Sequence, residues 1–426
     1  MSRIPVIDSA RRVPARRPGL RLIDLTVASR DLVEASGLAL VTGGLVLAAG
    51  FGLPAVLLFL AGGTLLTVTA PAAACAALTR HWLLLAFPAW AMVSVLWSAD
   101  PSATLRAALQ MIVTVALCLI AIETTGRRVL ILTTAVVLVA ALHSIALSDR
   151  TEVIWFTGDL VRIGIFGSKN NASLIAGECL LLAVLLAACA PRGSLVRWIA
   201  LPIAVIACGA LIAAKSLGTI LAVALCLGVA TLLALLSAGT TVALRRGLLV
   251  AMALTLLTGA VWLAVTTGAD SYRQAMQAIG KDPTLTGRTQ IWAVGWASVT
   301  QHPWLGLGHY AFWRAENPTA VLLWTMARRE IGAPFGFHNL YLHHWVETGA
   351  IGAGLVAAAM VRLLAAVWTR TVAGLSARGA AATALGLFFV AKSLVETVGF
   401  EAFSFHTFTF ILAWCLLTGP GPDPTP

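Results

Sequence analysis

The sequence predicts an all-α fold, a polytopic membrane helical bundle of about twelve transmembrane helices with a long outward loop that carries short helices. Hydrophobic residues make up 59% of the 426 positions, charged residues only 11%, and mean hydropathy is +0.91. A soluble domain has roughly 45–50% apolar and about 25% charged residues. The net charge of +11 comes from Lys and Arg clustered between apolar runs, as orientation signals are, so nucleic acid is not an expected partner.

The first 33 residues form a basic N-terminal segment. "MSRIPVIDSARRVPARRPGL" is rich in arginine and has no apolar run long enough for the core of a signal peptide. Residues 1–33 are therefore expected to be a cytoplasmic tail, part of it an interfacial helix. A short C-terminal tail is expected at 420–426.

Apolar runs of roughly 17–25 residues are long enough to cross a bilayer as helices. They fall into nine runs within 34–266 and three within 340–419. The expected spans are 34–50, 53–70, 82–98, 104–124, 128–147, 171–190, 196–213, 217–237, 246–266, 340–366, 378–398 and 403–419. A cytoplasmic N-terminus puts most of the basic clusters on the cytoplasmic side, so segment 267–339 is expected to face outward.

Segment 267–339 is polar, punctuated by Gly and Pro, and too short for an independent domain with its own core. Short amphipathic helices packed over the bundle are expected instead. In "GRTQIWAVGWASVTQ", one helical face collects Ile291, Trp292, Gly295, Trp296 and Val299. The tryptophans of the segment suit a membrane interface; they are Trp292, Trp296, Trp304, Trp313 and Trp324.

Basic residues within or flush with spans are costly and indicate function. Six of them fall at the outward ends of expected helices: Arg106, Arg162, Lys169, Lys215, Arg288 and Lys392. Together they predict a cationic pocket for an anion, above all a phosphate or pyrophosphate. The competing interpretation of any one of them is a snorkelling anchor at a helix end.

That competing interpretation is weakest for Arg288 and Lys169. Arg288 lies in the Pro/Gly/Thr-rich turn "DPTLTGRT", where no anchor is needed, just before a helix start. Lys169 lies in "GSKNNAS", a polar helix start expected to offer free N–H groups beside its ammonium group.

Three histidines lie close together in "GAPFGFHNLYLHHW". A helical metal pair needs i,i+3 or i,i+4 spacing, whereas His338 precedes His343 and His344 by five and six residues, so a metal site would require distant ligands. His338 lies at the mouth of a span, where a largely neutral imidazole can act as a general base. His302 is expected to cap a turn, and the seven cysteines lack the pattern of a zinc or disulfide frame.

Four stretches, in this order and spacing, resemble the O-antigen ligase and polysaccharide polymerase superfamily, and most closely its succinoglycan-type exopolysaccharide polymerases. They are "LWSADPSATLR", "RIGIFGSKNNASLIA", "DPTLTGRTQIWAVGWASVTQHPWLGLGHYAFW" and "FHNLYLHHWVETGAIG". The resemblance runs from about residue 90 to residue 415. Each motif alone is weak, and the ordered set is fairly specific.

The resemblance implies a metal-independent, inverting glycosyltransferase in the bacterial inner membrane, without a cofactor and with its active face and loop in the periplasm. The family takes glycan from undecaprenyl pyrophosphate and passes it to lipid A-core or to another lipid-linked repeat unit, sometimes with a chain-length regulator. Carried onto this sequence, it makes Arg288 and His338 catalytic. Arg162, Lys169 and Arg288 would bind the pyrophosphate, with Lys215 as a further candidate.

Three other functions compete with a polymerase. A ligase that transfers finished O-antigen to lipid A-core would use the same motifs. A transporter of lipid-linked glycan would carry its ionisable residues near the bilayer midplane and show inverted repeats, whereas these charges cluster at one face. A shape-type peptidoglycan polymerase is chemically close but fits the ordered motifs poorly.

Overall fold

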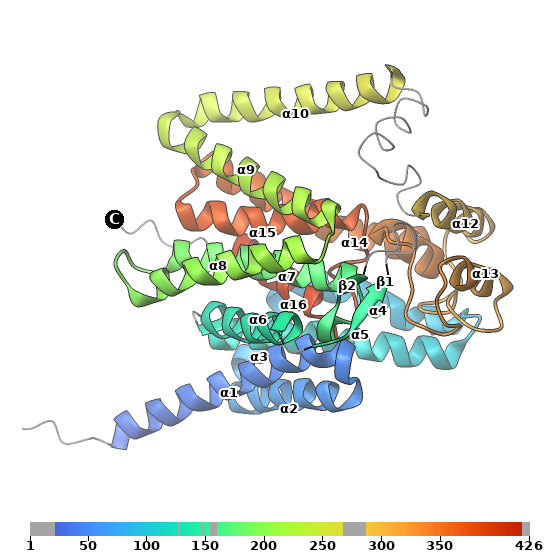
Figure 1. Cartoon of the computed structure of the whole chain (residues 1–426), viewed down its shortest axis with the longest axis horizontal. Coiled ribbons are helices and arrows are strands. Elements are labelled where there is room, and N and C mark those ends of the chain that lie inside the picture. Colours follow the sequence, from blue (N-terminus) through green and yellow to red (C-terminus); the bar gives the residue numbers. More distant parts are fainter. Residues whose placement is uncertain (1–21, 127, 147, 154–159, 267–286, 420–426) are drawn as a thin grey trace, which may run out of the picture.

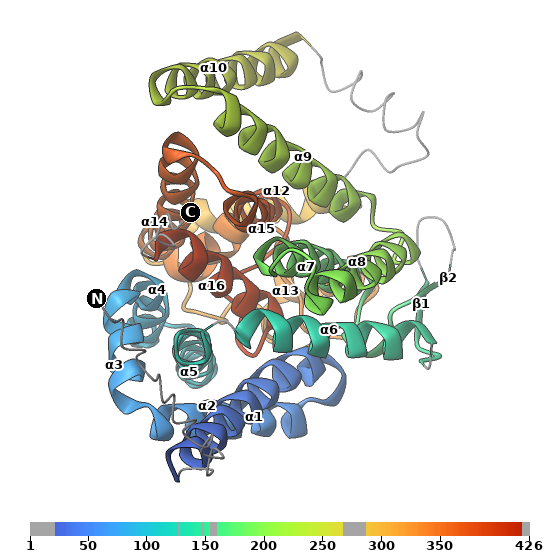
Figure 2. The same cartoon turned by 90° about the vertical axis from the view of Figure 1, so that its left-hand side faces the viewer.

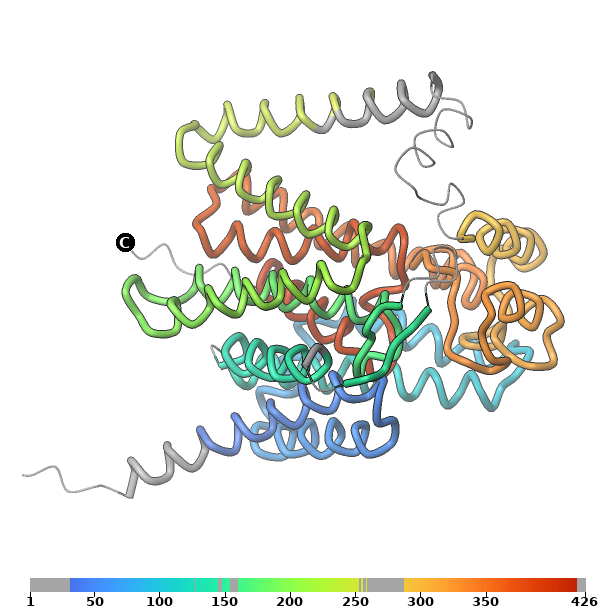
Figure 3. The backbone as a smooth tube through the Cα atoms, viewed as in Figure 1, coloured from blue at the N-terminus to red at the C-terminus, as the bar shows by residue number. Residues whose placement is uncertain are grey.

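The computed structural model describes residues 22–126, 128–146, 148–153, 160–266 and 287–419 (Figure 3). Most of the predicted N-terminal tail, loop residues 267–286 and the predicted C-terminal tail lie outside these ranges. The described chain confirms the all-α prediction, with one small antiparallel ribbon as its only sheet.

The first part of the chain runs from α1 to α6. Its elements are α1 (Leu22–Phe51), α2 (Leu53–Thr69), α3 (Pro71–Arg80), α4 (Trp82–Val93), the 3-10 helix η1 (Ser94–Leu96), α5 (Pro101–Thr125) and α6 (Arg128–Ala146). The sequence did not predict α3, which follows α2 after a bend of 106°. Pro71 at the first position of α3 favours this new helix start, because proline fits the first turn.

The remaining part begins with the ribbon and continues to α16. Its elements are β1 (Thr151–Val153), β2 (Leu160–Arg162), η2 (Gly164–Phe166), α7 (Lys169–Cys189), α8 (Leu195–Ala213), α9 (Leu217–Gly239), α10 (Val242–Thr266), α12 (Arg288–Gln301), α13 (Pro318–Met326), α14 (Leu340–Ala373), α15 (Ala377–Ser393) and α16 (Phe405–Thr418). In the ribbon, Thr151 pairs with Arg162 and Val153 with Leu160.

Six helices of the described residues are long and apolar enough to cross a membrane: Asp31–Phe51, Pro101–Thr125, Lys169–Cys189, Leu195–Ala213, Leu217–Gly239 and Leu340–Ala373. Each overlaps a predicted span. The bent pair α2 and α3 passes the same test together, and three shorter apolar helices accompany these: Trp82–Leu96, Arg128–Ser144 and Phe405–Thr418. The total of twelve spans stays a prediction.

The long helices run side by side, and their ends meet at two opposite faces (Figure 1). Seen along the bundle, α1 and α2 lie at one side and α9 and α10 at the other, with α7, α15 and α16 between them (Figure 2). The main apolar core fills this centre with fully buried rings such as Phe388, Phe389 and Phe410. The ribbon, α12 and α13 gather at one end of the bundle, at the right of Figure 1.

Described residues 287–339 share a second apolar core with the start of α14. Ile291, Gly295 and Val299 of α12 are buried, as the predicted face requires, and they belong to or adjoin a cluster that includes Trp313 and Trp324. The interface prediction is therefore wrong for these two tryptophans, because they fill this core. Trp296 and Trp304 remain exposed.

Helix α14 is broken at Gly349, and the backbone of the preceding loop satisfies the break. The amides of Leu307 and Gly308 donate to the carbonyls of Val346 and Glu347 at 3.1 and 2.8 Å, and the amide of Ala350 donates to the carbonyl of Pro303. A break in an apolar helix requires such partners, because unpaired backbone groups are costly away from water. The loop 303–308 is thereby fixed against the first half of α14.

Two arginines bind carbonyl groups at helix ends. Arg245 at the start of α10 donates to the carbonyl of Val372 at 3.0 Å, near the end of α14. Arg370 donates to the carbonyls of Leu417 and Gly419 at 2.6 and 2.9 Å, at the end of α16. The last carbonyls of a helix lack partners within it, so these guanidinium groups complete the two helix ends.

We expect Gly349→Ala to lower the free energy of unfolding by at least about 2 kcal/mol, because φ there is +69° and an added Cβ would lie 2.0 Å from the carbonyl oxygen of Trp304. Gly354→Ala on the same helix is the matched control. Its Cβ would meet nothing within 4 Å, and it should be neutral or stabilising by up to about 1 kcal/mol. Thermal unfolding in detergent measures both, and equal midpoints would disprove the break at Gly349.

Candidate functional site

The carboxylate of Glu396 joins the two residues that the sequence predicted as catalytic. Its Oε1 accepts a hydrogen bond from Nη2 of Arg288, and its Oε2 lies 2.8 Å from Nδ1 of His338. Asn170 of α7 adds a longer contact of 3.5 Å to Oε1. Four segments far apart in the sequence thus meet at one acidic side chain.

Local backbone structure sets the positions of Arg288 and His338. Gly287 adopts φ +82° as the N-cap of α12, so Arg288 is the first residue of that helix. His338 itself adopts φ +48°, a conformation unusual for a non-glycine residue, and Asn339 then caps α14 by accepting from the amide of Leu342. Strained backbone of this kind is often found at functional sites.

Asn339 also links the two segments that carry His338 and Glu396. Its side-chain amide donates to the carbonyl of Leu394 at 3.0 Å, just before Glu396. Glu396 lies in the turn that follows α15, with its own amide bonded to the carbonyl of Lys392. The segment "FHN" therefore both presents the imidazole and holds the turn that contacts it.

Glu396 is ionised although it is well covered. Burial opposes its charge, but the hydrogen bond from His338 and the charges of His338, Arg288 and Lys392 together lower its pKa to about 2. Its side chain is 9% exposed, against 18% for Arg288 and 27% for His338. The carboxylate is thus the most covered of the three groups, and the imidazole of His338 is the most exposed.

An ionised carboxylate only accepts hydrogen bonds, so Nδ1 of His338 is the donor in their contact. When the imidazole is neutral, its Nε2 then carries the lone pair, and this atom bonds to no other described residue. A histidine oriented in this way by a carboxylate is suited to accept a proton.

Most N–H groups of Arg288 can bind a partner other than Glu396. A guanidinium has five N–H groups, and of these only Nη2 is bonded within the described chain, to Glu396. The remaining donors match the oxygens of a phosphate. Two cations, Arg288 and Lys392, thus lie close enough to the one carboxylate of Glu396 to lower its pKa.

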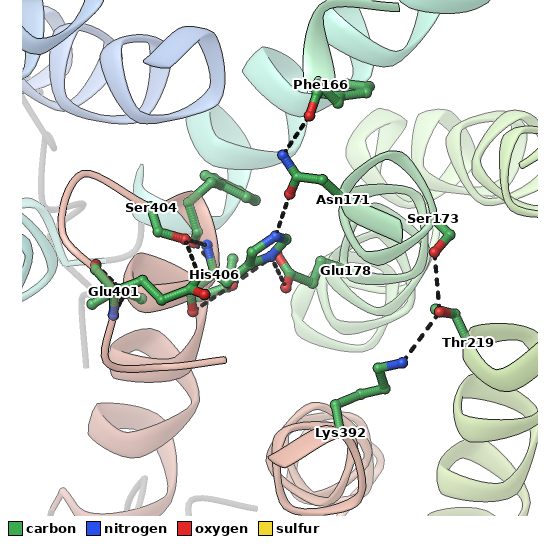
Figure 4. Close-up of polar contacts among 12 residues, drawn as sticks. Phe166, Asn171, Ser173, Glu178, Thr219, Lys392, Glu401, Ser404 and His406 are labelled. Atoms are coloured by element: carbon green, nitrogen blue, oxygen red, sulfur yellow. Dashed lines mark hydrogen bonds and ion pairs between the residues drawn. The ribbon is translucent and has the colours of Figure 1, made fainter. Parts of the chain in front are cut away.

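Lys392 is buried one helical turn before Glu396 and connects the site to two further helices. Its ammonium group donates to Thr219 of α9 at 3.4 Å, and the hydroxyls of Thr219 and Ser173 of α7 lie 3.1 Å apart (Figure 4). This chain of polar contacts fixes the end of α15 against α7 and α9.

The contacts that join Arg288 and His338 do not include the other three predicted pyrophosphate ligands. Arg162 ends β2, Lys169 begins α7 immediately before Asn170, and Lys215 lies in the turn between α8 and α9, four residues before Thr219. Their roles as ligands stay predictions.

The expectation of free N–H groups at the start of α7 is wrong for two of them. Ser168 accepts from the amide of Asn171 at 3.2 Å, and Glu152 accepts from the amide of Lys169 at 2.7 Å. Glu152 also forms an ion pair with Arg329 at 2.8 Å. The chain therefore supplies its own anion to this helix start, which links the ribbon to the segment after α13.

Sequence reasoning missed Glu396 and Glu178. The signal for Glu396 was an acid four residues after Lys392 at the end of an apolar run, and that for Glu178 was a lone acid inside one. Oε1 of Glu178 on α7 lies 2.6 Å from Nδ1 of His406 on α16 (Figure 4). The other ring nitrogen of His406, Nε2, lies 2.5 Å from Oδ1 of Asn171. This second network holds α7 against α16 inside the bundle.

The long apolar helices indicate an integral membrane protein. Residues 180–357 match the O-antigen ligase family, a range that contains Arg288 and His338 and ends before Glu396. The exopolysaccharide production protein ExoQ of Rhizobium meliloti (strain 1021) is 29% identical over 286 residues. That match covers 65% of this chain and 62% of ExoQ.

Both comparisons agree with the ordered motifs. They confirm the predicted resemblance to the O-antigen ligase and polysaccharide polymerase superfamily.

We expect the stabilising effect of Glu396 to disappear at acid pH. A carboxyl group whose pKa is lowered on folding contributes its full stability above its ordinary pKa of 4.5, and loses it as pH falls toward its folded pKa of about 2. Wild type should therefore exceed Glu396→Gln in unfolding midpoint near pH 7, and the difference should shrink between these two values.

Glu401→Gln provides the opposite control, because burial raises the pKa of Glu401 in the same interhelical segment. The advantage of wild type over that variant should grow as pH falls. A pH-independent difference for Glu396→Gln would contradict the ion-pair description.

Proposed function

We propose that this protein is a membrane-embedded inverting glycosyltransferase. It transfers glycan from undecaprenyl pyrophosphate to a sugar hydroxyl and so polymerises exopolysaccharide or O-antigen repeat units. The observation that carries this proposal is the contact of Glu396 with both Arg288 and His338, within a chain similar to O-antigen ligases and ExoQ. The site lies at the periplasmic face of the inner membrane in this proposal.

His338 acts as the general base. Its Nε2 removes the proton from the attacking sugar hydroxyl as that oxygen forms a bond to the anomeric carbon of the donor. Glu396 holds the opposite nitrogen at 2.8 Å and stabilises the imidazolium that results. Inversion follows because the hydroxyl attacks opposite the departing oxygen.

Arg288 stabilises the leaving group. The bond between the anomeric carbon and the pyrophosphate oxygen breaks, and the electron pair leaves with undecaprenyl pyrophosphate. The unused N–H groups of Arg288 bind its oxygens, helped by Arg162, Lys169 and Lys215. Pyrophosphate is already a good leaving group, so positioning and charge supply most of the rate. The guanidinium and ammonium groups take the place that a divalent cation has elsewhere.

An apolar groove supports the binding of a lipid-linked donor. Its volume is about 450 Å³, and it lies between α1 and α6, with Gly43, Phe51 and Val139 among its lining residues. Ile165 of η2 closes one part of the groove, four residues before Lys169. A polyprenyl tail in this groove would bring its head group toward the start of α7.

A second cavity, of about 550 Å³, supports a separate place for the acceptor. Trp97, His302 and Trp304 line it, and the Trp304 side chain is largely exposed. Sugars stack on exposed indole rings, whereas the buried Trp313 and Trp324 are excluded from this role. The acceptor would be a second lipid-linked repeat unit.

A ligase reaction is the second candidate, because the matched family is named for O-antigen ligases. The chemistry at His338 and Arg288 would be unchanged, and lipid A-core would replace the growing chain as acceptor. The name of ExoQ as an exopolysaccharide production protein favours the polymerase.

His338→Ala and Arg288→Ala are each expected to abolish detectable long polymer in a strain that lacks the native gene. Loss of a general base typically costs roughly 10²–10⁴-fold in rate. Arg246→Ala, which changes an exposed arginine, and Arg80→Ala, which breaks an exposed ion pair with Glu123, are the controls and should retain wild-type chain length.

Immunoblots must show equal membrane insertion of all four variants. Full-length polymer from either site variant would remove that residue from the mechanism. Isolation of the wild-type product separates the two candidate reactions, since a ladder of lipid-linked or free polymer indicates a polymerase and glycan on lipid A-core indicates a ligase.

Gly43→Leu is expected to weaken use of a long-chain donor, because its side chain would fill the groove between α1 and α6. Gly228→Leu on α9 is the control, since a Cβ there also meets nothing within 4 Å but projects outside the groove. With purified protein, Gly43→Leu should raise KM for an undecaprenyl donor more than for a short-prenyl donor. An equal effect on both donors would place the lipid elsewhere.

A further inference from the structure

A second group of titratable side chains lies at the break of α14, apart from Arg288, His338 and Glu396. It consists of His309 in the loop after α12 and of His344 and Glu347 on α14. All three are buried, and one potential ligand atom of each lies within 4.8 Å of the others. His309 Nδ1 and Glu347 Oε2 are only 2.8 Å apart.

Several polar atoms of this group have no hydrogen-bond partner among the described residues. Both ring nitrogens of His344 are buried and unpartnered, and so is Oε1 of Glu347. Nε2 of His343 lies 3.4 Å from that oxygen. A buried polar group without a partner is costly and requires an explanation, such as an ion.

A second group of possible metal ligands in the described chain, formed by His81, Glu123 and Cys415, differs in this respect. His81 accepts from Trp414 at 3.1 Å through Nδ1 and lies 3.3 Å from Glu123 through Nε2, while Glu123 also binds Arg80. Its ring nitrogens are therefore satisfied by the protein. The contrast singles out His344.

We propose that His309, His344 and Glu347 bind a divalent first-row transition-metal ion of the Zn²⁺ class. His344 and Glu347 are three residues apart on one helix, a spacing that brings two ligands to one face. Two imidazoles and one carboxylate form a nitrogen-rich ligand set, which favours Zn²⁺ and similar ions over Mg²⁺ or Ca²⁺. On binding, the ion would take the place of the hydrogen bond between Nδ1 of His309 and Oε2 of Glu347, and the proton would be released to solvent.

The surrounding contacts would support these ligands. The amide of His309 donates to Ser94 at 3.0 Å, and the amide of Gly308 donates to the carbonyl of Glu347 at 2.8 Å. The ring of Phe87 packs against His344, with centroids 4.3 Å apart. A bound ion would therefore clamp the loop 303–309, α4 and the first half of α14 together. It would be structural and would take no part in glycan transfer.

The test uses the full chain, purified in detergent without a histidine tag and treated with a chelator. Co²⁺ titration of wild type should reach saturation at about one ion per chain, with visible absorption bands of a low-coordinate site, and Zn²⁺ should displace it. Zn²⁺ should also raise the unfolding midpoint. Absence of saturable Co²⁺ absorption in wild type would overturn the proposal by itself.

His344→Gln and Glu347→Gln should each weaken Co²⁺ binding at least about tenfold. His302→Gln, which changes an exposed histidine of the same loop, should leave binding unchanged. Unchanged binding in both ligand variants would also overturn the proposal. If a ligand variant does not fold, the stoichiometry and spectrum of wild type still decide. Because the readout is metal binding, failure here leaves the proposed glycan transfer unaffected.

Discussion

A carboxylate buried among apolar helices costs several kcal/mol unless a partner compensates for its lost water. Among the described residues, four buried or partly buried carboxylates are each paired with a histidine. The pairs are Glu123–His81, Glu178–His406, Glu347–His309 and Glu396–His338. Each joins segments distant in sequence, so each holds two parts of the bundle in register. The apolar core supplies bulk, whereas these pairs specify which helices meet.

One of the four pairs differs from the others in exposure. The histidine side chain is 3% exposed in His81 and 6% in His309 and His406, but 27% in His338. An arginine shares the carboxylate at Glu123 and at Glu396, but the histidine of the Glu123 pair is buried. The same kind of pair that joins buried segments elsewhere therefore places the imidazole of His338 near the guanidinium of Arg288. Only one nitrogen of that guanidinium is bonded within the described chain. The proposed function therefore relies on a carboxylate–histidine pair of the same kind at a more exposed position.

The sequence predicted the fold class and much of the site because the relevant signals were local. Arg288 was set apart by its turn and His338 by its place at the mouth of a span, and both contact Glu396. Glu396 itself was missed, because an acid at a helix end looks like an ordinary charge until its distant partners are known. The break at Gly349 was missed for a similar reason: it depends on the amides of loop 303–308, which no helical period reveals. Trp313 and Trp324 appeared interfacial because composition does not show that a loop has its own core.

Arg245 and Arg370 have two roles. Their guanidinium groups bind the last carbonyls of α14 and α16. Both residues also belong to the basic residues from which the orientation in the membrane is predicted. Experiments that reverse membrane topology by moving positive charge would therefore change both the orientation signal and a helix end at these positions. Lysine would preserve the electrical signal but not the planar fork that binds Leu417 and Gly419 together. Arg246, exposed beside Arg245, is the position at which insertion signals can be altered without unravelling a helix terminus.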